Sequence, residues 1–576
     1  MFSITLSSDA PWQSAISVYT EAPSHRLVVD DVVVCGNARL DRDRQGGAAA
    51  DRQRDLRTVA LTYIEGGIDA VTRLNGSFGV VLWDSRHRRL HAVRDALGLS
   101  PLYYRSDPRE LVIADSLDGL RSDERIDADF IATFIATGGP DPSRTIWKDS
   151  SPLPPGSVLT RRDDRTVVCT YWSPLEFGEA HRSKGDDAAA EFRRLVREAL
   201  SRDLDPAGGT WAHLSGGHDS SSVVSMAAAM QAEDDRWALG GTLTLADSFG
   251  SGDESTFSDL VLDRYRLRNE RLDDVAPWTD DGLAPPRTPH PTRDYPFFAR
   301  DRIASRQMRA HGATSLLSGL GPDLYLPFTA LHATDLFWSG RPTEGLRLAC
   351  EWSIARGERL WTSVWRHLMM PVVPRRVRLW ARRRRTPFPA WMQTTFIREH
   401  GFADCLVALD VPVSRRLRLL PSLLAEHFAA MSASLDGWLL YDGIEIRHPL
   451  LYRPLVEFCL SLPSAHRMDV RAPKPVLRHA MQGIVPDAVL ARRSKGAAIL
   501  PRVCWALARE RHRIAHLLRT SALADLGVIE PAKALHAAEE AAAGRLGYAA
   551  KHLYYALSIE TWFAVRNGRY AVSTVH

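Results

Sequence analysis

Apolar residues in the first third of the chain come in short runs with polar breaks between them, a pattern typical of β-strands. Residues 26–36 form one β-branched run that ends at Gly36. Further strand-like runs cover residues 78–84, 88–95, 102–105, 110–115 and 152–160, with a polar turn at 85–88 and a proline–glycine turn that enters the last run. We therefore expect a β-rich structure over about the first 175 residues.

The pattern changes at the polar stretch 179–187, where we place a boundary between domains 1–180 and 181–576. Residues 188–204 carry apolar side chains at helical spacing. Strand-like runs at 209–215, 238–246 and 313–321 then alternate with helical segments such as 221–232, and the pattern is mostly helical from about residue 330. Alternating strands and helices predict a parallel sheet covered by helices, so the fold class is a two-domain combination of α+β and α/β.

Length and composition narrow the classes of protein. A chain of 576 residues is too long for a single core, and its six scattered cysteines include no CxxC pair. We therefore expect neither a zinc site nor a disulfide framework, and a cytoplasmic location fits. The start of the chain lacks the features of a signal peptide, and no window reaches about 18 uninterrupted apolar residues, so no membrane is expected as a partner. The net charge of +4 gives no indication of nucleic acid binding.

The most informative segment follows the strand-like run at 210–214 and reads Ser-Gly-Gly-His-Asp-Ser-Ser over residues 215–221, before a helical segment. A strand, a glycine loop and a helix N-terminus direct free backbone N–H groups and the helix dipole at one point, which suits an anion. No lysine closes the loop, so it is not the common phosphate loop. It matches S-G-G-x-D-S, the pyrophosphate loop of enzymes that cleave ATP between its α and β phosphates. Asp219 suits magnesium; the alternative is a capped glycine turn.

A second apolar run, at 316–326, also ends in a glycine loop with an acid, Asp323. Carboxylates at the carboxyl ends of parallel strands can share one magnesium ion in the crevice where such sheets bind ligands. Asp219 and Asp323 are therefore the predicted metal ligands. An Asx-type turn is the alternative interpretation of Asp323.

At this point the chain resembles the asparagine synthetase family over nearly its whole length. Residues 73–105 look like the family's glutaminase domain, and residues 145–159 and 171–174 resemble the hinge to the second domain. The second domain shows matching motifs, in order, at 215–221, 318–323, 445–463, 474–489 and 492–496. The resemblance implies an N-terminal Ntn-hydrolase-like β-sandwich with helices and a C-terminal ATP-pyrophosphatase sheet, with ATP and magnesium as cofactors.

Two departures from the family change the expected function. The family's glutaminase needs an N-terminal cysteine as nucleophile, whereas Met1 is followed here by Phe2 and the nearest cysteine is Cys35. The domain is therefore expected to be an inactive glutaminase, with the pocket-like residues Asn75, Gly76 and Asp95 as scaffold. In the loop 318–323 the family has an acid, a glycine and a glutamate where this chain has Leu320, Pro322 and Leu324. These replacements predict a substrate other than aspartate and ammonia.

Relatives without the cysteine include β-lactam synthetases and lasso peptide cyclases, which adenylate a carboxylate and close a ring with an amine of the same molecule. β-Lactam synthetases keep a lysine in the region of residues 492–496 but place a tyrosine where Leu320 stands. The arginine-rich stretch 375–385 and the segment after it resemble lasso cyclases. The alternative interpretation of the arginine-rich stretch is a solvated helix face. The favoured prediction is a lasso peptide cyclase acting on a leaderless precursor peptide, alongside a leader peptidase and a leader-binding protein. A small-molecule amide or β-lactam synthetase, an ammonia-dependent asparagine synthetase and an inactive peptide-binding relative remain alternatives.

The resemblance also assigns roles within the second domain. Lys495, in the R-x-S-K-G pattern, is the candidate catalytic residue, because its ammonium can stabilise negative charge on the intermediate and the departing phosphate; the alternative is a surface lysine. No general base is assigned, and His448 is interpreted as structural. The candidate ATP-binding residues are Leu214, Ser215, Gly216, Gly217, Asp219, Ser220, Ser221, Gly319 and Lys474.

Overall fold

The computed structural model describes most of the chain. The described residues are 1–7, 16–21, 25–41, 52–107, 109–120, 125–162, 165–177, 185–246, 255–279, 282–327, 329–374, 376–380, 388–408, 419–435, 443–492 and 499–570. None of the helices in these ranges is long and apolar enough to cross a lipid bilayer.

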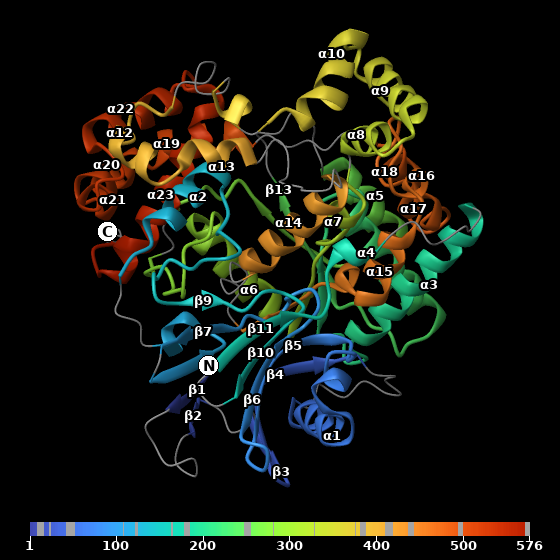
Figure 1. The fold of residues 1–576 in the computed structure, drawn as a ribbon. Coiled ribbons are helices and arrows are strands. Elements are labelled where there is room, and N and C mark those ends of the chain that lie inside the picture. Colours follow the sequence, from blue (N-terminus) through green and yellow to red (C-terminus); the bar gives the residue numbers. More distant parts are fainter. Residues whose placement is uncertain are drawn as a thin grey trace.

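Two antiparallel sheets form a sandwich in the first part of the chain (Figure 1). The five-stranded sheet has the order β2-β1-β8-β7-β9 and the six-stranded sheet the order β11-β10-β6-β5-β4-β3. Their apolar faces meet in a core that includes Phe2, Val81 and Ile113. The strands are β1 Phe2–Ser7, β2 Ile16–Thr20, β3 Arg26–Val29, β4 Val32–Leu40, β5 Gly76–Asp84, β6 Arg89–Arg94, β7 Tyr103–Ser106, β8 Glu110–Ala114, β9 Ser151–Pro152, β10 Ser157–Arg162 and β11 Arg165–Thr170.

Helices complete this part of the molecule. Helix α1, Arg52–Val71, packs Leu56 and Val59 against the other face of the six-stranded sheet, on Val80 and Leu82. Helix α2, Ala128–Thr137, instead joins a core that it shares with the C-terminal helices, in which Phe134 lies with residues such as Trp562. The first part of the chain is therefore tied to the second by a common hydrophobic core.

The second part is built on a five-stranded parallel sheet with the order β14-β13-β12-β15-β16. The chain runs outward from β12 to β13 and β14, and then returns to the other side of β12 for β15 and β16. The strand order thus reverses between β12 and β15, and ligands of such sheets bind at this position. The strands are β12 Thr210–His213, β13 Gly241–Ala246, β14 Asn269–Asp273, β15 Ser315–Leu317 and β16 Glu445–Arg447.

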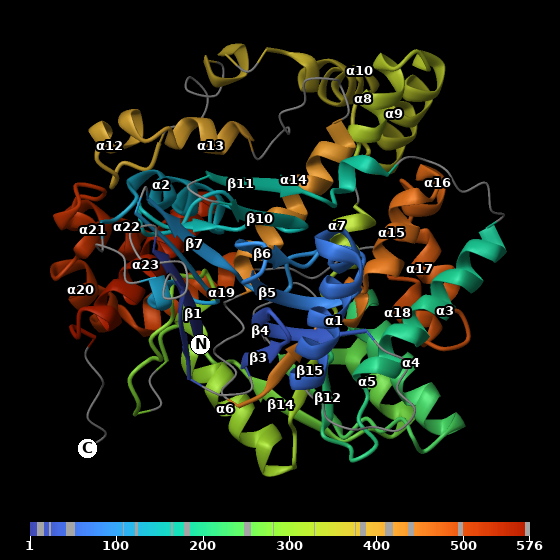
Figure 2. The ribbon, with the colours of Figure 1, turned by 60° about the horizontal axis from the view of Figure 1, so that its bottom comes forward.

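Helices surround this sheet and form a large C-terminal group beside the sandwich (Figure 2). The helices near the sheet are α3 Gly185–Asp203, α4 His218–Glu233, α5 Ser255–Tyr265, α6 Phe298–Ala310, α7 Pro322–Tyr325, α14 Leu419–Ser434, α15 Arg453–Ser461, α16 Ser464–Arg467, α17 Pro475–Ala480 and α18 Asp487–Leu490. The others are α8 Leu331–Trp338, α9 Pro342–Arg356, α10 Leu360–Val364, α12 Thr394–Glu399, α13 Phe402–Ala408, α19 Ile499–Arg509, α20 Arg511–Arg519, α21 Ala522–Asp525, α22 Pro531–Ala542 and α23 Ala550–Arg566.

The predicted fold class is confirmed, but one predicted strand is wrong. Residues 26–36 form a hairpin of two strands, because Asp30 adopts a φ of 50° and reverses the chain. The second strand then continues through Gly36 to Leu40, and a side chain at Gly36 would collide with the Gly79 carbonyl of β5. In the arginine-rich stretch, residues 375 and 381–387 lie outside the described residues.

Candidate functional site

The loop after β12 presents the start of a helix to the carboxyl edge of the sheet. Gly216 has a φ of 71°, which favours glycine, and α4 begins after Gly217 without a side-chain cap. The Ser220 hydroxyl holds the loop closed, since it lies 3.1 Å from the Ser215 backbone nitrogen and 2.9 Å from the Ser215 Oγ. An uncapped helix N-terminus behind a glycine loop is suited to bind phosphate.

The loop after β15 lies directly beside this helix start. Gly319 packs so closely on α4 that an added Cβ would lie 2.7 Å from the Ser220 nitrogen. Gly321 has a φ of 140° and turns the chain into α7, whose first turn carries Asp323. Asp219 and Asp323 therefore follow the two strands between which the sheet order reverses, as the sequence predicted.

Both predicted metal ligands bind the same lysine. The Lys474 Nζ lies 2.5 Å from the Asp219 Oδ2 and 2.6 Å from the Asp323 Oδ1. The side chains of Lys474 and Asp219 are both mostly buried, with only 4% of the Lys474 side chain exposed. The Asp323 side chain, by contrast, is 60% exposed. The structure thus brings together three residues that the sequence nominated from three separate motifs.

This pair of acids has the donor chemistry that magnesium requires. Two carboxylates already face one cation here, and magnesium in nucleotide sites is commonly held by one or two carboxylates together with phosphate oxygens. Within the described ranges no group of three or more His, Cys, Asp or Glu side chains could hold a metal without such help. The residues present therefore fit a metal that arrives with a nucleotide.

Arg492 is a neighbour of the loop that sequence reasoning missed. Its NH1 donates to the Gly216 carbonyl oxygen at 3.3 Å, and its guanidinium lies 4.8 Å from the centre of the Phe257 ring. The signal was present, because Arg492 opens the R-x-S-K-G pattern that drew attention to Lys495. Lys495 itself falls within residues 493–498, outside the described residues.

His213, Ser318 and His448 lie at the carboxyl ends of three neighbouring strands, β12, β15 and β16. Ser318 Oγ lies 2.6 Å from His448 Nδ1 and also accepts a hydrogen bond from the Leu320 backbone nitrogen at 3.2 Å. Burial lowers the pKa of His448 to about 4 and that of His213, which ends β12, to about 3. His448 is therefore neutral at neutral pH and supports the loop through Ser318.

Phe2 and Cys35 are both part of the sandwich core. The Phe2 ring is fully buried in the sandwich core, and its backbone nitrogen donates to the Asp115 carboxylate at 2.9 Å. Cys35 is also fully buried, and burial raises the pKa of its thiol to about 12, so it is no substitute nucleophile.

The residues that resemble a glutamine pocket have structural contacts. The buried Asp95 carboxylate accepts backbone hydrogen bonds from Leu97, Leu99 and Ser100 at 3.0–3.1 Å and from Phe78 at 3.3 Å, which organises the loop after β6. Gly76 lies against β4, where an added Cβ would approach the Arg39 carbonyl oxygen to 2.4 Å. Its neighbour Asn75 accepts a backbone hydrogen bond from Asp41.

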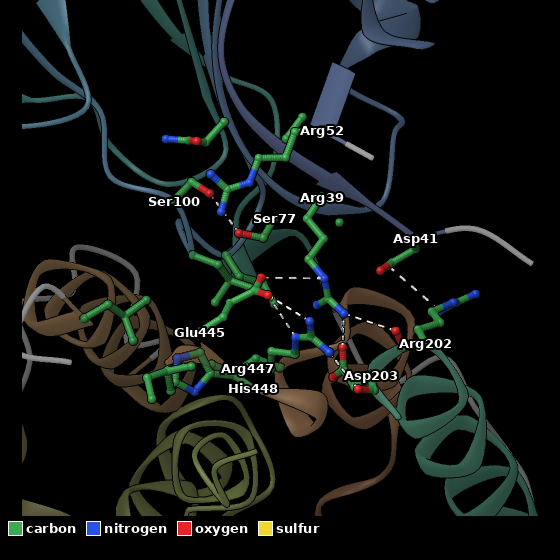
Figure 3. Close-up of a pocket in the computed structure, with 18 of the residues that line it drawn as sticks. Arg39, Asp41, Arg52, Ser77, Ser100, Arg202, Asp203, Glu445, Arg447 and His448 are labelled. Atoms are coloured by element: carbon green, nitrogen blue, oxygen red, sulfur yellow. Dashed lines mark hydrogen bonds and ion pairs between the residues drawn. The ribbon is translucent and has the colours of Figure 1, made fainter. Parts of the chain in front are cut away.

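A cavity of about 1100 Å³ lies between the sandwich and the parallel sheet (Figure 3). Ion pairs across it connect the two parts of the chain: Arg39 of β4 lies 2.6 Å from Asp203, and Arg202 lies 3.9 Å from Asp41. Burial raises the pKa of Asp41 to about 6. His448, which contacts Ser318, lines the cavity, whereas the predicted ATP-binding and metal-binding residues are not among its lining residues.

Comparisons with known proteins agree with this architecture. Residues 191–564 match the Asparagine synthase family, and residues 40–172 match the Glutamine amidotransferase domain. These two matches follow the parallel-sheet part and the sandwich part in turn. The first covers more than half of the chain, which is enough to assign a family.

Curated relatives are more distant and match in part. The chain is 30% identical to "Asparagine synthetase [glutamine-hydrolyzing] 3" of Bacillus subtilis over 32% of its own length and 31% of that protein. It is 25% identical to a putative asparagine synthetase of Methanocaldococcus jannaschii over 47% and 52%, and 29% identical to the amidase chyE of Penicillium rubens over 30% and 26%. The matched region thus spans between about a quarter and a half of these relatives. On the strength of its match to residues 191–564, the chain belongs to the asparagine synthase family.

Proposed function

We propose that the protein is an ATP-dependent carbon–nitrogen ligase that closes a macrolactam ring in a peptide, a lasso peptide cyclase. It adenylates an Asp or Glu side chain of a leaderless precursor peptide and releases pyrophosphate. It then joins that carboxyl group to the peptide's own N-terminal amine and releases AMP. The observation that carries the proposal is the pairing of an intact phosphate loop with a buried phenylalanine, Phe2, at the position where the resemblance places the family's nucleophile.

The chemistry begins with the low reactivity of a carboxylate toward an amine. Attack of the carboxylate on the α-phosphate of ATP gives an acyl-adenylate, which has a good leaving group. The loop 215–221 and the first turn of α4 bind and orient the triphosphate, and Lys474 and Arg492 add positive charge beside it. Asp219 and Asp323 would hold Mg²⁺, which offsets the charge that develops on pyrophosphate.

The source of the amine distinguishes this proposal from asparagine synthesis. Glutamine cannot supply ammonia, because the buried Phe2 stands where the family has its nucleophile. Leu320, which packs against the core around the loop, stands where asparagine synthetases have an acid. If the amine belongs to the peptide itself, the enzyme needs neither a glutaminase nucleophile nor an acid at the position of Leu320.

The cavity between the sandwich and the parallel sheet has room for more than an amino acid. Its volume of about 1100 Å³ is near the upper end of the range of small-molecule pockets, roughly 300–1,000 Å³. Ion pairs such as Arg39–Asp203 fix its walls on both sides. A peptide segment held in the cavity would be shielded from water, which would otherwise hydrolyse the activated carboxyl group.

The remaining roles follow from the same proposal. Lys495 stabilises the charge of the tetrahedral intermediate and the leaving AMP. The partners are the precursor peptide, a leader peptidase and a leader-binding protein, in the cytoplasm, with no role for nucleic acid.

Incubation with a leaderless precursor peptide, ATP and Mg²⁺ tests the proposal. The expected products are AMP, pyrophosphate and a peptide lighter by one water, identified by mass spectrometry. Turnover with a small amino acid substrate, and no cyclic product from any candidate peptide, would replace the cyclase by a small-molecule amide or β-lactam synthetase. The absence of any magnesium-dependent nucleotide binding in calorimetry would leave only a peptide-binding relative.

A further inference from the structure

We infer that Lys474 is a resident counter-ion that occupies the magnesium position until a nucleotide arrives, so that the free protein does not take up magnesium on its own. The inference rests on the proposed ATP site, but not on the identity of the substrate. It assigns to Lys474 a positioning role that precedes the chemistry: the lysine keeps the two acids together and sets the order in which nucleotide and metal bind.

The contacts of the ammonium group are those of a metal substitute. Its nitrogen lies 2.5 Å from one oxygen of Asp219 and 2.6 Å from one oxygen of Asp323. These two acids lie in the first turns of α4 and α7, and the lysine directly precedes α17, so three elements meet at one positive charge. Without a cation between them, two carboxylates close enough to contact one ammonium group would repel each other, and one of them would favour its protonated form.

Burial makes the exchange selective. Because Lys474 is 4% exposed and the Asp219 side chain 11% exposed, breaking their ion pair without a replacement would leave a buried charge uncompensated. A free Mg²⁺ ion would have to lose water molecules and also displace an ammonium that is paired with both acids. A nucleotide changes this balance, since its phosphate oxygens offer Lys474 new acceptors and offer the metal the remaining ligands.

The backbone of Lys474 is strained in the way that such a role requires. The residue adopts φ 55° and ψ 55°, a left-handed conformation that is uncommon for a side chain other than glycine. It also precedes Pro475, which favours an extended conformation instead. The local sequence therefore does not favour this geometry, and the ion pairs with both acids provide a reason for it.

Manganese binding without nucleotide tests the inference directly. Mn²⁺ is paramagnetic, so the bound ion is counted by electron paramagnetic resonance, and thermal melting with and without Mg²⁺ gives a second readout. Without nucleotide, wild type should bind no Mn²⁺ tightly. With a non-hydrolysable ATP analogue, it should bind one Mn²⁺ ion. Lys474→Met should bind one Mn²⁺ without nucleotide, about tenfold or more tightly than wild type, equivalent to about 1.4 kcal/mol. It should also melt lower than wild type and recover on addition of Mg²⁺.

Two further variants separate the site from general charge effects. Lys533→Met removes an exposed lysine that pairs with Glu530 at 2.7 Å, and it should leave Mn²⁺ binding unchanged. Asp323→Asn added to Lys474→Met should abolish the gained site. If Lys474→Met does not fold, the wild-type measurements decide alone.

The inference is overturned if wild type holds one Mn²⁺ tightly without nucleotide, or if Lys474→Met gains no affinity. It is also overturned if neither protein binds Mn²⁺ under any condition. The first two outcomes are distinct from a failure of the proposed function, because wild type that exchanges its metal as described and yet makes no cyclic peptide would refute the cyclase while leaving the counter-ion in place. The third outcome would also remove the metal from the proposed ATP site.

Discussion

Gly319 lies against the backbone of Ser220, so closely that an added Cβ would come within 2.7 Å of the Ser220 nitrogen and 2.9 Å of its Cα. This contact joins the loop after β15 to the first turn of α4. It sets the distance between the two loops, and therefore the position of Asp323 relative to Asp219. Gly319 thus acts through packing rather than through a side chain of its own.

Gly319→Ala should separate the two loops and impair catalysis. The added methyl group meets backbone atoms, which cannot move aside without moving the N-terminus of α4. We expect a loss of about tenfold or more in the rate of pyrophosphate release. Gly139→Ala is the matched control, since its Cβ would meet only the Ser434 hydroxyl at 3.8 Å. Equal activity of the two variants would contradict the packing role of Gly319.

Asp219→Asn and Asp323→Asn should each stop pyrophosphate release while the fold survives. Each change keeps the size of the side chain and removes one negative charge from a proposed metal ligand, which is worth several kcal/mol in the transition state. A loss of about 100-fold or more is expected, since each 1.4 kcal/mol is a factor of ten. Near-normal turnover in either variant, measured with a coupled pyrophosphate assay, would remove that residue from the site.

The parts of this site that could be predicted are those encoded locally. The glycines and serines of 215–221 are contiguous, so their loop and the helix after it follow from short-range preferences. The meeting of Asp219 and Asp323 also followed, because the carboxyl ends of parallel strands share one edge of a sheet. The short apolar runs likewise indicated that the first part is β-rich, whereas the two-sheet sandwich was implied by the resemblance to the family.

The parts that could not be predicted depend on long-range packing. The Lys474–Asp219 contact joins residues 255 positions apart and needs a backbone conformation that the lysine and the following proline disfavour. The three-residue β16 is too short for a periodic signal, and it lay within a segment that reads as helical. The hairpin at 26–40 was missed because Asp30 and Asp31 interrupt a β-branched run without glycine or proline.

Buried neutral histidines should make the fold sensitive to acid. The pKa of His448 falls from an ordinary 6.5 to about 4 in the fold because of burial. The stability that it contributes is thus fully present above pH 6.5 and is lost as the pH falls toward 4, since the unfolded chain then binds the proton first. Between pH 7 and pH 5, the free energy of unfolding should therefore fall by about 2 kcal/mol less in His448→Asn than in wild type.

Urea denaturation at the two pH values measures this difference. His536→Asn, at a side chain that is 74% exposed, serves as the control. An identical loss of stability in wild type and His448→Asn would show that His448 is protonated as easily in the fold as in the unfolded chain.

Phe2 should contribute to stability and not to glutamine chemistry. Its ring is fully buried between the two sheets, so Phe2→Ala should lower the free energy of unfolding by about 3–5 kcal/mol. Tyr19→Ala, at a side chain that is 53% exposed, should change it by less than about 0.5 kcal/mol. Neither variant nor wild type should release glutamate from glutamine, and release well above background would overturn the assignment of an inactive glutaminase.

The identity of the two reacting groups can be tested on the peptide and the enzyme separately. Replacing the acceptor Asp or Glu by its amide should stop AMP formation, because an amide cannot be adenylated. Acetylating the N-terminal amine should leave pyrophosphate release and block ring closure, since the nucleophile is gone.

Lys495→Ala should still bind ATP but form little cyclic product, because it lacks the ammonium that offsets charge on the intermediate. Ring closure should need neither ammonia nor glutamine. If free aspartate and ammonia support AMP formation while no peptide cyclises, the amine comes from outside the substrate, and the asparagine-forming reaction replaces the cyclase.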